Sequence, residues 1–226
     1  MAEIEAVLFD LDGTLVDTAP DMVNALNALL QQEGRQPLPY GRVRNHVSKG
    51  ASALIRLGFG QTIDDATRLG LLERFLALYS ENLCVESGLF TGMAEALAGF
   101  EQQGTVWGVV TNKPGWLTGP LLQQLGLLQR AGCVISGDSL DKKKPDPAPL
   151  LHACDTIGVI AENTVYIGDD ERDIVAGKAA GMHTLVASYG YINSDEDPLS
   201  WGADGMLHSA AELQHWLANG FTGGAQ

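Results

Sequence analysis

The feature that most constrains this chain is a short apolar run that ends in two carboxylates. Residues 4–9 are apolar except for Glu5, and Asp10-Leu11-Asp12-Gly13-Thr14 follows directly. A run of this length predicts a buried strand with a turn at its C-terminal end. Asp is common where strands end, so turn formation is the simpler explanation of either carboxylate taken singly. However, alternate residues of an extended chain lie on one side, where Asp10 and Asp12 repel each other unless a cation or a proton lies between them.

Beyond residue 85 the sequence alternates between short apolar runs and helical patterns. The runs that predict strands are 105–110, 133–136, 164–167 and 183–187. The patterns that predict helices are 95–102, 117–125, 148–156 and 172–180. Such alternation predicts an α/β fold whose core is a doubly wound, Rossmann-like parallel sheet.

The segment between the first strand and this alternating region contains helical patterns and no convincing strand. The patterns cover residues 22–30, 43–47, 51–57 and 64–79. We therefore expect two domains: an α/β core of residues 1–17 and 86–226, and a small all-helical cap of residues 18–85 inserted after the first strand. Residues 220–226 are expected to form a frayed tail.

Charge and cysteine usage restrict the partners and the compartment. The 226-residue chain has a formal net charge of -14, which disfavours nucleic acids and anionic membranes as partners. The three cysteines lack metal-binding spacing, and no run is long enough to span a membrane. We expect a cytoplasmic protein, either a monomer or a homodimer. A small anionic substrate would need a locally positive site.

Polar residues also follow the later strands. Thr111 ends the second strand, Lys144 closes a run of three lysines before Pro145, and the acidic turn Gly168-Asp169-Asp170-Glu171-Arg172-Asp173 follows the fourth. Singly, these are an ordinary strand residue, a solvated lysine face and a helix cap. Together, at the carboxyl ends of parallel strands, they would meet Asp10 and Asp12. A phosphate monoester needs a nucleophile, a cation and positive groups on its oxygens, and carboxylate ligands favour Mg²⁺.

Four signatures in this order make the chain resemble the haloacid dehalogenase superfamily of aspartate-nucleophile phosphatases. They are Asp10-Leu11-Asp12-Gly13-Thr14, Thr111-Asn112, Lys144-Pro145-Asp146-Pro147 and Gly168-Asp169-Asp170-Glu171-Arg172-Asp173. The resemblance implies that Asp10 forms an aspartyl-phosphate and that Asp12 serves as general acid and base. It also implies Mg²⁺ held by Asp10, the Asp12 carbonyl, Asp169 and Asp173. Thr111, the Asn112 backbone N–H and Lys144 would bind the transferring phosphoryl group.

The helical insert is similar to the cap of the phosphoglycolate phosphatase-like branch of this family. That similarity implies a small phosphomonoester substrate such as 2-phosphoglycolate. Strings outside the cap, among them 89–93, 107–114 and 189–192, resemble members of the branch that act on N-acetylmuramate 6-phosphate, so these two compounds are the best candidates. The cap loop departs from the Gly-rich loop of the branch, and we hypothesise that its Arg44, His46 and Lys49 face the substrate. The simpler alternative is that these three are solvated residues at helix ends.

Three other functions are compatible with parts of the pattern. A dehalogenase would need neither a metal nor the second acid, so Asp12 and Asp169 oppose it. A phosphohexomutase would share all four signatures and would differ mainly in keeping water out. A non-enzymatic, metal-stabilised binding module would not need Asp10 as a nucleophile, and the joint presence of Asp10, Asp12 and Lys144 opposes it.

Overall fold

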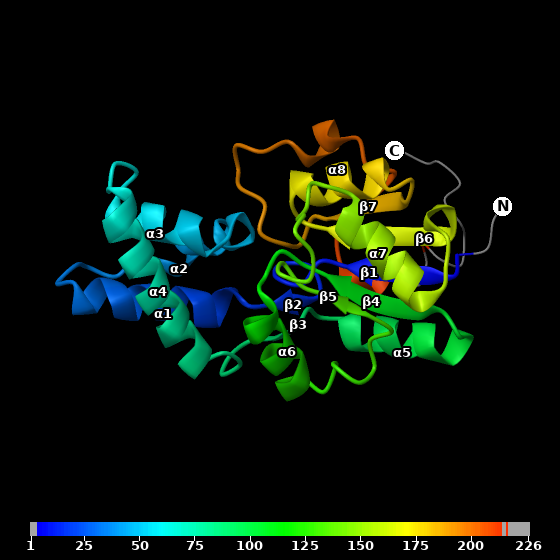
Figure 1. Ribbon diagram of the computed structural model, residues 1–226, viewed down its shortest axis with the longest axis horizontal. Coiled ribbons are helices and arrows are strands. Elements are labelled where there is room, and N and C mark those ends of the chain that lie inside the picture. The colour runs from blue at the N-terminus through cyan, green and yellow to red at the C-terminus, as the bar shows by residue number, and fades with distance from the viewer. Residues whose placement is uncertain (1–3, 214–215, 217–226) are drawn as a thin grey trace.

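A parallel β-sheet forms the centre of the protein in the computed structural model, which describes residues 4–213 and residue 216 (Figure 1). Its strand order is β5-β4-β1-β6-β7-β8, and every neighbouring pair is parallel. The strands are β1 (Ala6–Phe9), β4 (Val106–Val110), β5 (Val134–Ile135), β6 (Thr164–Gly168), β7 (His183–Ala187) and β8 (Gly205–Leu207). The predicted doubly wound α/β fold is confirmed.

Helices cover both faces of the sheet. The helices of this part are α5 (Met93–Gln103), α6 (Gly115–Gln124), α7 (Ala148–Ile157) and α8 (Glu171–Ala179). Side-chain alternation along β1 separates the faces, since Phe9 packs in one apolar cluster with Phe100 of α5, whereas Leu8 packs in a second cluster with Leu150 of α7 and Ala176 of α8. Every strand residue of β1 is fully buried, as a central strand requires.

The register of the central strands brings their polar ends together. Phe9 pairs with Val109 on one side and with Ile167 on the other, so β1, β4 and β6 end at nearly the same level. The ladder continues one step further, because the Asp10 N–H donates to the Ile167 carbonyl at 2.8 Å. Asp10 and Thr111 therefore leave neighbouring strands at the same edge of the sheet.

Residues 19–81 form a separate group of helices beside this edge (Figure 1). The group consists of α1 (Ala19–Gln32), α2 (Tyr40–Arg44), the 3-10 helix η1 (Val47–Lys49), α3 (Ala51–Phe59) and α4 (Asp65–Glu81). Leu26, Leu54 and Phe75 are fully buried where α1, α3 and α4 pack together. Thr18 directly precedes α1, but its hydroxyl donates to Asp12 and does not cap the helix, and the Ala19 N–H in the first turn donates to the Tyr191 hydroxyl.

Several elements were not predicted from the sequence. The two-residue strands β2 (Val16–Asp17) and β3 (Gly88–Leu89) pair antiparallel where the chain enters and leaves the helical group. Strand β8 extends the sheet by a sixth strand, and the short 3-10 helices η2 (Ala161–Asn163), η3 (Pro198–Trp201) and η4 (Ala210–Glu212) complete the described elements. The tail expected at residues 220–226 lies outside the described residues. No described helix combines the length and apolar character needed to cross a membrane.

Candidate active site

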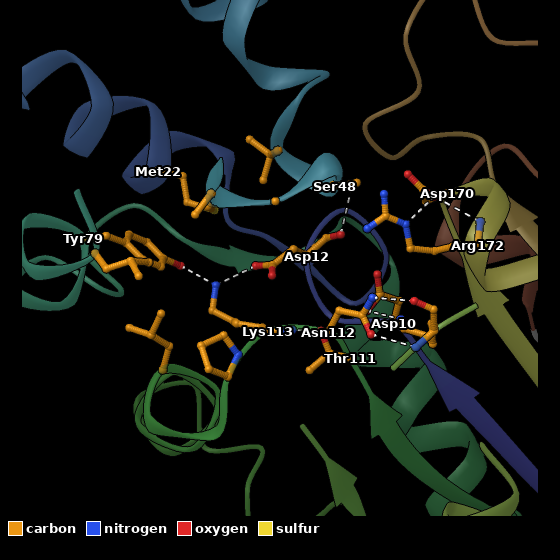
Figure 2. Close-up of a pocket in the computed structure, with 17 residues that line it drawn as sticks. Asp10, Asp12, Met22, Ser48, Tyr79, Thr111, Asn112, Lys113, Asp170 and Arg172 are labelled. Carbon is orange, nitrogen blue, oxygen red and sulfur yellow. Dashed lines mark hydrogen bonds and ion pairs between the residues drawn. The ribbon is translucent and has the colours of Figure 1, made fainter. Parts of the chain in front are cut away.

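A cavity of about 130 Å³ lies between the strand ends and the helical group (Figure 2). Its core side is polar and consists of Asp10, Asp12, Thr111, Asn112, Lys113, Lys144, Asp170 and Arg172. Pro114 and Leu117, next to and in α6, also line it from the core, and the side of the helical group is mostly apolar and consists of Met22, Val47, Ser48, Gly50, Ala51, Leu76 and Tyr79. The structure thus brings Asp10, Asp12, Thr111, Asn112 and Lys144 together around one cavity, from three separate segments of the chain.

Lys144 is the buried cation of this site. Its ammonium lies 2.8 Å from Asp10 Oδ1 and 2.8 Å from Asp173 Oδ1, and it donates to the Tyr166 hydroxyl at 2.8 Å. Burial alone would lower the pKa of Lys144, but the carboxylates of Asp10 and Asp173 raise it above its ordinary value. Lys144 is therefore charged and lies beside Asp10, where a phosphoryl group would need a positive partner.

Asn112 and Thr111 brace the segments that carry the lysines. The Asn112 amide donates to the Lys144 carbonyl at 3.0 Å and accepts from the Lys144 N–H at 3.1 Å, which fixes the Lys144 backbone against the end of β4. Thr111 Oγ1 accepts from the Lys113 N–H at 3.2 Å. Both residues line the cavity, as their predicted contact with a phosphoryl group requires.

Asp10, Asp169 and Asp173 form an acidic cluster whose candidate ligand atoms all lie within 4.8 Å of one another. Burial, reinforced by Asp10 and Asp173, raises the pKa of Asp169 well above its usual range. Burial likewise raises the pKa of Asp173 to about 6. Asp10 Oδ1 is buried and accepts no well-oriented hydrogen bond from any described residue. Its contact with Lys144 is therefore an ion pair without hydrogen-bond geometry. Oxygen ligands in mutual repulsion suit a hard cation such as Mg²⁺.

The geometry around Asp169 depends on a glycine at residue 13. A Cβ atom there would lie 2.2 Å from Asp169 Oδ2, and Gly13 has a φ of 87°, which L side chains rarely adopt. Asp169 Oδ2 accepts from the Tyr191 N–H and from the Ser48 hydroxyl, both at 2.7 Å. Glycine in the Asp-x-Asp-Gly-Thr turn thus leaves room for the carboxylate to approach Asp10.

Asp12 takes no part in this cluster through its side chain. Its Oδ1 accepts from the Thr18 hydroxyl at 2.6 Å and from the Lys113 ammonium at 2.9 Å. Its backbone carbonyl, one of the metal ligands implied by the sequence resemblance, accepts from Ser48 Oγ at 3.3 Å. Asp10 and Asp12 therefore have different surroundings, as separate chemical roles require.

From the sequence alone, no role is predicted for Lys113, Tyr79, Ser48 or Tyr191. Their side-chain contacts in the site, such as Lys113 with Asp12 and Ser48 with Asp169, join positions far apart in the chain, so no local pattern predicts them. Lys113 had the strongest signal, since it directly follows the Thr111-Asn112 signature.

The cap-loop residues lie at the contact between α2, η1 and the core. Arg44 donates to the carbonyls of Gly190 at 2.9 Å and Tyr189 at 3.1 Å, and Lys49 forms ion pairs with Asp170 and Glu196. His46 Nδ1 is buried and has no hydrogen-bond partner among the described residues. None of the three belongs to the described lining of the cavity, and their contact with a substrate stays a prediction.

Comparison with known proteins places the chain in a family. Residues 7–187 match the haloacid dehalogenase-like hydrolases. A phosphoglycolate phosphatase of Xanthomonas campestris is 47% identical over 92% of this chain and 94% of its own length. An N-acetylmuramic acid 6-phosphate phosphatase of Pseudomonas aeruginosa is 41% identical over 93% of each chain.

Solved structures of similar fold point to the same family. A crystal structure described as a predicted phosphoglycolate phosphatase from Haemophilus somnus has a TM-score of 0.84 at 27% identity, and the match covers 95% of this chain and 98% of that one. The polar strand ends, the acidic cluster and these similarities lead to one conclusion. The chain belongs to the haloacid dehalogenase-like hydrolases, and it is a phosphatase of that family.

Proposed function

We propose that the protein hydrolyses a small phosphomonoester through an aspartyl-phosphate on Asp10. The observation that carries the proposal is the position of Asp10 at the cavity floor, 2.8 Å from the buried ammonium of Lys144, with Asp12 lining the same cavity. In the first step an Asp10 oxygen bonds to phosphorus while the bond from phosphorus to the leaving oxygen breaks, and Asp12 gives that oxygen a proton. Lys144 offsets the negative charge of the transferring group.

In the second step Asp12 takes a proton from water, whose oxygen attacks phosphorus. The bond between phosphorus and Asp10 then breaks, inorganic phosphate leaves, and Asp10 is a free carboxylate again. Thr111 and the Asn112 backbone N–H would hold the phosphoryl oxygens in both steps. Asp12 donates a proton in the first step and accepts one in the second, and both transfers require one of its carboxylate oxygens to face the cavity.

The acidic cluster fits the Mg²⁺ that this family implies, because it combines a buried oxygen of Asp10 that accepts no well-oriented hydrogen bond from the described residues with two further carboxylates of raised pKa. Asp10, Asp169 and the Asp12 carbonyl would hold the ion, with Asp173 as a supporting carboxylate. When bound, the ion polarises the phosphoryl oxygens and screens the negative charge of the nucleophile.

We further propose that residues 18–85 act as a cap domain over a core of residues 1–17 and 86–226, in a cytoplasmic protein. Support comes from the cavity itself, which Met22, Val47 and Leu76 close from the helical side. The two candidate substrates, 2-phosphoglycolate and N-acetylmuramate 6-phosphate, follow from the similarity to phosphatases named for them.

Phosphate release tests this proposal. The protein is assayed with Mg²⁺ on 2-phosphoglycolate, N-acetylmuramate 6-phosphate and several hexose phosphates. We expect release on at least one of them, loss of activity in excess chelator, and loss of activity in Asp10→Asn. Equal activity in Asp10→Asn would exclude the aspartyl-phosphate, and isomerised product without free phosphate would instead identify a mutase.

A further inference from the structure

Lys113 is a buried cation for which the proposed steps have no use. It is 8% exposed and extends from the end of β4 between Asp12 of the core and Tyr79 of α4 (Figure 2). Its ammonium donates to Asp12 Oδ1 at 2.9 Å and to the Tyr79 hydroxyl at 2.9 Å, and it lies 4.6 Å from the centre of the Tyr79 ring. Burial alone would lower the pKa of Lys113, but Asp12 and Tyr79 raise it, so the group is charged.

These contacts use most of the hydrogen-bonding capacity of the Lys113 ammonium. A lysine ammonium has three donors, and two of them are used by Asp12 and Tyr79 while the Tyr79 ring covers part of its surface. A group held in this way is poorly placed to reach out and bind a substrate anion. A purely stabilising role is also a weak explanation, because a buried ion pair seldom adds more stability than apolar side chains of the same volume.

The contact with Lys113 also orients the Asp12 carboxylate. Thr18 and Lys113 both donate to Oδ1, and among the described residues none is recorded as donating to Oδ2. Two donors on one oxygen fix the plane of the carboxylate and leave the other oxygen for the leaving group. Effective proton transfer requires such fixed geometry at hydrogen-bond distance.

We propose that Lys113 is a positioning residue for Asp12, and that Tyr79 positions Lys113 in turn. The inference rests on the proposed function, in which Asp12 is the general acid and base. Because Tyr79 belongs to α4 of the cap and Lys113 to the core, the full set of contacts forms only when the cap lies over the core. Seating of the cap thereby completes the orientation of the acid.

Leaving groups that differ in their need for a proton test this role. Lys113→Met keeps the length of the side chain and removes its donors, and Tyr79→Phe keeps the ring and removes only the hydroxyl. The matched control is Lys142→Met, since the Lys142 side chain is 65% exposed and, within the described part of the chain, forms an ion pair with Asp146 alone. Each variant is assayed on an alkyl phosphate, whose leaving oxygen must be protonated, and on p-nitrophenyl phosphate, whose leaving group departs as a stable anion.

General acid catalysis contributes about 10²–10⁴-fold, so Lys113→Met should lower kcat/KM, which reports formation of the aspartyl-phosphate, by about 10²-fold on the alkyl phosphate. On p-nitrophenyl phosphate, whose leaving group needs no proton, we expect a loss of kcat/KM of less than about threefold. Tyr79→Phe should show the same bias with a smaller loss, and Lys142→Met should match the unmodified protein. In an Asp12→Asn background, Lys113→Met should cause no further loss of kcat/KM on the alkyl phosphate, because the group that it orients is absent.

Equal losses of kcat/KM on the two substrates would overturn the inference. If Lys113→Met does not fold by circular dichroism, Tyr79→Phe decides the matter alone, and an unchanged ratio of the two rates would be contrary evidence. Failure of the proposed function is a different result, since the unmodified protein would then release no phosphate or Asp10→Asn would remain active.

Discussion

Asp21 is a buried carboxylate that lies outside the catalytic cavity. It is 2% exposed and accepts from the backbone N–H groups of Val85, Glu86 and Ser87 at 2.9–3.1 Å, and from the Ser87 hydroxyl at 2.6 Å. Asp21 lies in the first turn of α1, and residues 85–87 follow α4, so one side chain joins the two ends of the helical insert. This contact holds the cap at its base.

We predict that Asp21→Ala lowers the free energy of unfolding by about 3 kcal/mol, because three backbone donors and a hydroxyl lose a charged acceptor. Urea unfolding at neutral pH measures the change. Asp155→Ala is the control, since Asp155 is exposed on α7 and should stay within about 0.5 kcal/mol of the parent. Equal urea midpoints for the two variants would show that the N–H groups of residues 85–87 bind water with no loss of stability when Asp21 is removed.

At the scale of residues, the sequence predicts the functional side chains that directly follow a strand, and it does not predict contacts between residues far apart in the chain. Asp10, Thr111 and Asp169 could be assigned because each follows an apolar run whose end must lie at one edge of a parallel sheet. Tyr191 could not be assigned, although its hydroxyl donates to Asp17 at 2.5 Å and accepts from the Ala19 N–H at 2.9 Å. More than 170 residues separate these partners, so only the folded chain shows the contact.

At the scale of elements, helix α2 and helix η1 bind the core through side chains that the sequence suggested for the substrate. Arg44 donates to two carbonyls in the 189–190 segment, and its guanidinium lies 4.8 Å from the centre of the Tyr191 ring. Lys49 reaches Asp170, the residue that caps α8. In this conformation these contacts hold the cap loop on the core, which is a different role from selecting a substrate.

We predict that Arg44→Gln raises KM by roughly tenfold, equivalent to about 1.4 kcal/mol, through loss of charged hydrogen bonds between cap and core. The increase should be the same for a small and a large phosphomonoester, because the lost contacts do not involve the substrate. Arg56→Gln is the matched control, since Arg56 donates within the cap to the Gln61 carbonyl. A change in the relative rates on the two substrates would instead support direct contact of Arg44 with the substrate.

The elements that escaped prediction have a common cause. Strand β8 has three residues and β2 and β3 have two each, and none of them lies in a run of three apolar side chains. Strand β5 also has two residues, but it lies in the apolar run Cys133-Val134-Ile135. Strand β8 forms beside the longer β7, whereas β2 and β3 pair with each other where the two ends of the helical group meet. The long helices and the five longer apolar runs were visible because their own patterns suffice.

At the scale of the whole molecule, the acidic cluster links the stability of the fold to pH and to Mg²⁺. Burial raises the pKa of Asp173 from 3.8 to about 6, and it raises the pKa of Asp169 as well. Between about pH 4 and pH 6 the folded protein therefore holds protons that the unfolded chain has lost. The contribution of Asp173 to stability is complete below that window and is lost as the pH rises through it, and the raised pKa of Asp169 acts in the same direction.

Mg²⁺ should restore this loss, because it binds the ionised carboxylates and competes with their protons. At a hundredfold excess over Kd, a ligand that binds only the folded state adds about 2.7 kcal/mol, so Mg²⁺ should raise Tm by about 5–10 °C at pH 7.5. At pH 5 the rise should be much smaller, since the cluster then retains its protons. Thermal unfolding in chelator and in Mg²⁺ at the two pH values measures the effect, with Asp169→Asn as the variant that should not respond. An equal rise in Tm at both pH values, or in Asp169→Asn, would place the ion elsewhere and remove Asp10, Asp169 and Asp173 as its ligands.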